Sequence, residues 1–282
     1  MKFYYFGGNF YDGHTTLLEN SHFDGVMFVY DSALGDVFTK MVENIKTNEK
    51  IKYLVAIRPY AISPQYLCMI NQSMNSIMPD KLQINFVSGY IKEHEKSFGG
   101  ILGNINDNSD RIERSNYLID YIDVLNTMPG NQGSLKLDFY VSTTNEYVFK
   151  ATEKYDNKII ISYKDYKNGY WTVVDNLYGN IIGNNFDCSE RKIMLAITPI
   201  IRKTQDELDR SEEYANRPIW REDERQGTVT DIEYFTYEEF DKFIVNLESK
   251  GIDGVLINGH LQEERENIIS FVKQYKEGLF KG

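Results

Sequence analysis

Eight short apolar runs constrain the fold of this chain more than any other feature of its sequence. Most are nearly continuous in apolar residues rather than alternating, which is typical of parallel strands that are covered on both faces. Helix-length segments separate most of them. The runs comprise residues 2–6, 25–30, 52–57, 82–87, 135–141, 158–161, 192–201 and 254–257. Eight such strands with intervening helices predict an α/β fold, namely a closed (β/α)8 TIM barrel.

The third and fourth runs, with the segment between them, form the clearest strand–helix–strand unit. Arg58 follows the third run, and Ser88 and Gly89 follow the fourth. Between them, Ser63 followed by Pro64 predicts a helix start, with serine as the N-cap and proline at the first helical position. In parallel α/β folds the ligand lies at the carboxyl ends of the strands. The residues that follow the runs are therefore the first candidates for a binding site.

Other helices carry start and stop signals of their own. Thr236 and Glu239 have capping-box spacing, and an apolar stripe follows them. Gly251 lies where a left-handed C-terminal residue would end that helix. Residues 109–126 and 262–275 also have helical periodicity. Three further stretches match no barrel element: residues 88–108, 163–191 and 212–229. Because the first two follow strand ends, we expect them to contribute to the site.

Composition narrows the class of protein. The 282 residues fit one large barrel, so residues 1–282 are predicted to form a single (β/α)8 domain. A net charge of −11 argues against a nucleic-acid-binding surface. No apolar run approaches the roughly 20 residues that span a bilayer, so no membrane association is expected. Cys68 and Cys188 have neither metal-site nor disulfide-framework spacing, which favours a reducing, cytoplasmic setting.

The residues at the predicted strand ends are rich in hydroxyl and small side chains and poor in catalytic groups. They include no carboxylate pair, no cluster with metal-ligand spacing and no Ser-His-Asp set, and the whole chain has four histidines. We therefore predict no metal site. A site without its own strong acid, base or metal usually takes its chemistry from a cofactor.

Three positions are candidates for ligand contacts. Ser142, Thr143 and Thr144 lie between a strand and a predicted helix start, where hydroxyls and free amides can bind an anion. The alternative is that Thr144 only caps that helix. Arg58, beside a proline, can pair with an anionic ligand or with a loop carboxylate. Asn85 interrupts an apolar strand, so it must hydrogen-bond either a ligand or a neighbouring strand's side chain.

The order of several short motifs resembles the luciferase-like flavin-dependent monooxygenases, the group that includes bacterial luciferase and above all the alkanesulfonate monooxygenases. The motifs are Gly25-Val-Met-Phe-Val, Ala56-Ile-Arg-Pro59, Ser63-Pro64, Asn85-Phe-Val-Ser-Gly89 and Asp110-Arg111. The resemblance implies a (β/α)8 barrel that binds FMN, which is favoured here over the deazaflavin of some branches. It also implies that Asn85, Ser88 and Gly89 line the flavin and that Ser142, Thr143 and Thr144 hold its phosphate.

Departures from the family pattern concern the substrate side. Ala196 and Thr198 stand where the alkanesulfonate enzymes carry an arginine and a histidine, and His260 replaces a substrate-side tyrosine. The insertion before the last strand is reduced to about residues 212–229. The chain therefore looks like a shortened, divergent member of this family. The resemblance supports the fold and the cofactor class more strongly than it supports a particular substrate.

These observations predict an FMN-dependent monooxygenase that oxidises a small organic substrate with O2, with His260 and Arg58 as candidate catalytic residues. The chain has no G-x-G-x-x-G fingerprint for a nicotinamide cofactor, so reduced flavin would come from a separate flavin reductase. Two alternatives stay open. The alternative for His260 is that it only caps the last helix or faces solvent. The alternative for the protein is that it is a non-catalytic flavin-binding or interaction subunit of the same fold. The sequence also leaves a homodimer open.

Overall fold

The computed structural model describes residues 1–8, 22–29, 36–44, 50–87, 111–142, 148, 151–155, 158–163, 192–215, 232–259 and 262–280. Within these ranges, eight parallel strands close into a barrel, each paired with the next and the last with the first. The strands are β1 (Lys2–Gly8), β2 (Gly25–Val29), β3 (Lys52–Ile57), β4 (Leu82–Val87), β5 (Asp138–Ser142), β6 (Lys158–Ser162), β7 (Ile193–Arg202) and β9 (Gly254–Ile257). The predicted (β/α)8 TIM barrel is confirmed.

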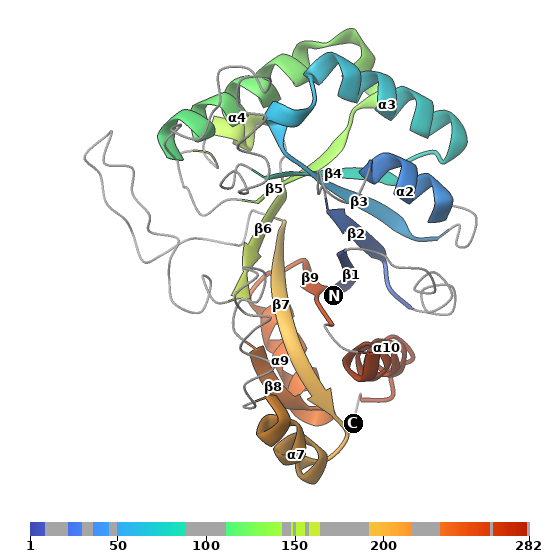
Figure 1. Cartoon of the computed structure of the whole chain (residues 1–282), viewed down its shortest axis with the longest axis vertical. Coiled ribbons are helices and arrows are strands. Elements are labelled where there is room, and N and C mark those ends of the chain that lie inside the picture. Colours follow the sequence, from blue (N-terminus) through green and yellow to red (C-terminus); the bar gives the residue numbers. More distant parts are fainter. Residues whose placement is uncertain are drawn as a thin grey trace.

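Helices surround the barrel in two groups. Figure 1 shows α2, α3 and α4 over the part of the barrel formed by β2 to β5, and α7, α9 and α10 beside β7 and β9. The bounds are α2 (Val37–Asn44), α3 (Pro64–Ile77), α4 (Arg111–Thr127), α7 (Gln205–Ala215), α9 (Tyr237–Ser249) and α10 (Gln262–Lys276). Within the described part of the chain no helix is long and apolar enough to cross a membrane.

The predicted helix signals act as expected. The Ser63 hydroxyl accepts a hydrogen bond from the Tyr66 amide at the start of α3. Thr236 and Glu239 form the reciprocal capping box of α9. After α9, Gly251 has a φ of 80°, a left-handed conformation that glycine adopts at little steric cost.

The structure also corrects three predicted boundaries. An additional strand, β8 (Ile232–Thr236), pairs, among the described strands, with the outer half of β7 alone, from Thr198 to Arg202. The fifth barrel strand begins at Asp138 rather than at residue 135, because Gly133–Leu135 form a 3-10 turn. Residues 212–215, assigned to a stretch outside the barrel elements, belong to α7, while residues 216–229 of that stretch lie outside the described residues.

Side chains on the strands alternate between two separate apolar clusters. The inner cluster fills the barrel and contains Tyr4, Met27, Leu54, Ala56, Tyr140, Ile160, Met194 and Leu256. The outer cluster packs the opposite strand faces against the helices and includes Phe3, Val55, Ile84, Phe240 and Phe271. The continuous apolar runs are thus explained, because both faces of every barrel strand are buried.

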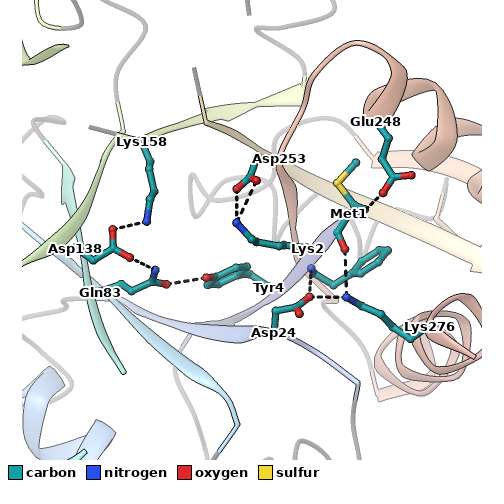
Figure 2. Close-up of polar contacts among 11 residues, drawn as sticks. Met1, Lys2, Tyr4, Asp24, Gln83, Asp138, Lys158, Glu248, Asp253 and Lys276 are labelled. Atoms are coloured by element: carbon teal, nitrogen blue, oxygen red, sulfur yellow. Dashed lines mark hydrogen bonds and ion pairs between the residues drawn. The ribbon is translucent and has the colours of Figure 1, made fainter. Parts of the chain in front are cut away.

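A polar chain crosses the interior near the amino ends of the strands (Figure 2). The Tyr4 hydroxyl donates to Gln83 Oε1 at 2.7 Å, and Gln83 Nε2 donates to Asp138 Oδ2 at 2.6 Å. The Lys158 ammonium contacts the same carboxylate, and nearby Lys2 pairs with Asp253 at 2.9 Å. These groups satisfy one another at the end of the barrel opposite to the carboxyl ends of the strands. The polar groups left for a ligand therefore have to be sought at the carboxyl ends.

Tyr121 offers a test of the packing outside β4. Tyr121 is 4% exposed and its ring lies 5.6 Å from the Phe86 ring, yet its hydroxyl has no hydrogen-bond partner among the residues that the structure describes. An unsatisfied buried hydroxyl costs free energy that a phenylalanine does not. We expect Tyr121→Phe to raise the free energy of unfolding by about 1 kcal/mol in urea denaturation. A destabilised variant would show that the hydroxyl has a partner in solution.

Candidate functional site

Two predicted site residues, Asn85 and Ser142, are in direct contact inside the barrel. Asn85 lies in β4 and is 2% exposed, and Ser142 is the last residue of β5. The Ser142 hydroxyl donates to Asn85 Oδ1 at 2.9 Å. The other end of the amide, Nδ2, lies 3.8 Å from the Met27 sulfur. The neighbouring-strand partner that the sequence left open for Asn85 is therefore Ser142.

Apolar side chains lie toward the same end of the barrel as this pair. Phe6, Val29, Val87 and Ala196 are partly buried and pack against the inner cluster. Among the described residues, this polar pair therefore lies beside several apolar side chains. Ligand sites commonly have this composition, with few polar groups in a mostly apolar cavity.

Arg58 lies at the end of β3, directly before the 3-10 turn Pro59–Ala61. Its Nη1 donates to the Tyr60 hydroxyl at 2.5 Å, and the guanidinium carbon is 5.9 Å from the centre of the same ring. Tyr60 itself is buried against Ala61 and Tyr117. Tyr60 therefore helps to orient the Arg58 guanidinium at the rim.

The seventh strand carries the two residues that depart from the family pattern. Ala196 packs against the inner cluster and Thr198 is 6% exposed. Farther along, Arg202 pairs with Glu264 of α10 at 2.7 Å, and both side chains are buried. Within the described part of the chain, Glu264 Oε2 has no hydrogen-bond partner. The pair joins the end of β7 to the first turn of α10. This helix begins two residues after the candidate residue His260.

Five predicted site residues lie outside the described residues: Ser88, Gly89, Thr143, Thr144 and His260. Their predicted roles stay predictions. The nearest described positions are Val87, Ser142 and Gly259, at or just past the carboxyl ends of β4, β5 and β9. Among the described residues, no group of three His, Cys, Asp or Glu side chains could hold a metal ion.

Sequence reasoning missed Met27 and the Arg202–Glu264 pair. Met27 gave no signal, because a methionine in an apolar run reads as a core residue. Arg202 gave no signal of a partner, because Glu264 lies 62 positions away. Only closure of the barrel brings these side chains together.

A groove of about 850 Å³ lies elsewhere, between α2 and α3. Its lining includes Val37, Val42, Tyr66 and Met69 from these helices and Ile57 from β3. Ile57 belongs to the outer cluster, so the groove is part of the helical layer and not of the barrel interior. We place the candidate site at the strand ends, where the buried polar pair lies, rather than in this groove.

Comparison with known proteins gives similarity of structure only. No protein-family model and no curated protein matches the sequence. Apo-MsnO8 has a TM-score of 0.68 at 8% identity, with 98% of each chain covered. The monooxygenase RslO1 from Streptomyces bottropensis has a TM-score of 0.63 at 13% sequence identity, again with 98% of each chain covered. An F420-dependent secondary alcohol dehydrogenase has a TM-score of 0.62 at 12% sequence identity, and the match covers 96% of this chain and 97% of the other. At the level of the fold, the predicted resemblance to luciferase-like proteins is confirmed.

Proposed function

We propose that this chain is an FMN-dependent monooxygenase-like enzyme that oxidises a small organic substrate with O2. The observation that supports this most is Asn85, a buried amide at the carboxyl ends of the strands whose Nδ2 contacts only a thioether among the described residues. A flavin ring carries carbonyl oxygens and ring nitrogens that accept hydrogen bonds. The donor and its apolar surroundings therefore fit a flavin.

When bound and reduced, FMN would supply the electrons that activate O2. The chain's own residues would bind, orient and shield the reactants. Asn85 would donate to a ring acceptor, and Phe6, Val29 and Val87 would keep water from the reacting atoms. Arg58 would hold an anionic group at the rim. Free imidazole titrates near neutral pH, so a histidine is suited to proton transfer there, and we assign that role to His260.

We further propose that the substrate is not an alkanesulfonate. Ala196 and Thr198 supply no positive charge, so they cannot hold a sulfonate as an arginine would. A separate flavin reductase would deliver the reduced cofactor. The deazaflavin alternative is kept as a comparison, because one structurally similar protein is F420-dependent.

Titration of the purified protein with oxidised FMN, reduced FMN and F420, followed by fluorescence quenching, tests the cofactor. We expect FMN to bind and F420 to bind less tightly. Reduced FMN, O2 and either short aldehydes or alkanesulfonates then test the reaction, with product, sulfite and peroxide measured. Sulfite release at enzymatic rates would contradict the substrate proposal. Binding of FMN with peroxide as the sole product would favour the non-catalytic flavin-binding subunit.

Thr143→Glu tests the proposed phosphate position. A carboxylate at the predicted anion site repels the FMN phosphate, so we expect FMN affinity to fall by about tenfold or more, on the order of 1.4 kcal/mol. Thr127→Glu is a matched control, because it makes the same change at an exposed position at the end of α4. Equal FMN affinity in Thr143→Glu and the control would exclude Thr143 from the phosphate site.

A further inference from the structure

The hydrogen bond between Ser142 and Asn85 fixes which end of the amide faces a ligand. Ser142 is paired in register with Val87, two residues beyond Asn85, so both side chains point into the barrel from neighbouring strands. At 2.9 Å the Ser142 hydroxyl donates to Asn85 Oδ1. The oxygen end of the amide is therefore occupied, and the NH2 end is turned away from β5.

The NH2 end of Asn85 faces a weak acceptor. Nδ2 lies 3.8 Å from the Met27 sulfur, and a thioether accepts hydrogen bonds poorly. Among the described residues, no other acceptor contacts this amide, and Asn85 is 2% exposed. A buried donor with so weak a partner gains free energy from any stronger acceptor that reaches it.

The surrounding side chains leave room for such an exchange. Ala56 on β3 is paired in register with Asn85, so the neighbour of Asn85 on the side toward β2 is a small methyl group. Met27 is unbranched and can change rotamer at little cost. An acceptor at the strand ends can therefore replace the thioether contact without breaking the bond to Ser142.

We propose that Ser142 is a positioning residue, which holds Asn85 as a hydrogen-bond donor toward a carbonyl oxygen or ring nitrogen of the ligand. This assigns Ser142 a role different from the phosphate contact that the family resemblance implies. The identity of the ligand as a flavin rests on the proposed function. The orientation of the amide does not.

Comparison of FMN with riboflavin, which lacks the phosphate, separates the two roles. If Ser142 positions Asn85, Ser142→Ala weakens binding of both flavins by the same factor, about five- to tenfold. Ser142→Thr keeps the hydroxyl and restores both affinities. In an Asn85→Ala background, Ser142→Ala has no further effect, because the group through which it acts is gone. Ser76→Ala, on the exposed face of α3, leaves both affinities unchanged.

Two results would overturn the proposal. A loss confined to FMN would assign Ser142 to the phosphate, and a loss that persists in the Asn85→Ala background would mean that Ser142 contacts the ligand directly. If the wild-type protein binds neither flavin, the proposed function fails, and NMR of the ligand-free protein tests the positioning role instead. The side-chain amide resonances of Asn85 should then shift in Ser142→Ala and return to their wild-type positions in Ser142→Thr. Unchanged resonances in Ser142→Ala would refute the positioning role.

Discussion

Replacing Arg202 with methionine should lower the free energy of unfolding by about 3–5 kcal/mol. Arg202 and Glu264 are 2.7 Å apart, and their side chains are 6% and 5% exposed. One Glu264 oxygen already has no hydrogen-bond partner among the described residues. Without the guanidinium the whole carboxylate is buried and uncompensated, which is far more costly than losing an exposed ion pair.

Urea denaturation of three variants tests this expectation. Arg202→Met should be strongly destabilised, while the double variant Arg202→Met/Glu264→Leu should recover much of the loss, because neither charge is then buried alone. Lys242→Met removes an ion pair with Glu238 whose side chains are 69% and 78% exposed, and should leave the midpoint unchanged. If Arg202→Met were as stable as Lys242→Met, the buried pair would have no net electrostatic role.

The barrel was predictable because its strands carry their own signal. Strands that are buried on both faces have apolar residues along their whole length. The start of the helix between β3 and β4 is marked by Ser63 as the N-cap and Pro64 as the first helical residue. β8 lacks that signal. Among the described residues it pairs with β7 alone, its five residues are all partly exposed, and its sequence, Ile-Glu-Tyr-Phe-Thr, includes both polar and apolar side chains in no continuous apolar run. A short strand of this kind cannot be distinguished from a loop by hydrophobicity alone.

The candidate site was predictable only where a residue conflicts with its surroundings. Asn85 stands out because an amide in an apolar strand has to be satisfied. Its contacts with Ser142 and Met27 depend on strand register and on the curvature of the barrel, which the sequence does not express. For Glu264 the difficulty is different, since it lies in a highly charged helix start and nothing local distinguishes a buried carboxylate from an exposed one.

Alkaline solution should unfold the protein steeply between pH 10 and 12. Burial raises the pKa of Tyr5 to about 12, and raises the pKa of Tyr4, Tyr121 and Tyr140 further still. In the unfolded chain tyrosine has a pKa of about 10. Above pH 10 the unfolded state therefore loses protons that the native state keeps, so the free energy of unfolding falls as pH rises. Four such residues give a slope of about 5 kcal/mol per pH unit, and below pH 10 they contribute no pH dependence.

Tyrosinate absorbance and far-ultraviolet circular dichroism, recorded through the same titration, measure this effect. Because these phenols resist ionisation while they are buried, a large part of the tyrosinate signal should appear together with the loss of secondary structure. Tyr121→Phe removes one of the four groups and should move the midpoint to higher pH. Tyr66→Phe, at a side chain that is 56% exposed, should not move it. Complete ionisation of all 21 tyrosines near pH 10 with the dichroism intact would show that Tyr4 and Tyr140 are open to water and that the barrel interior is not closed as described.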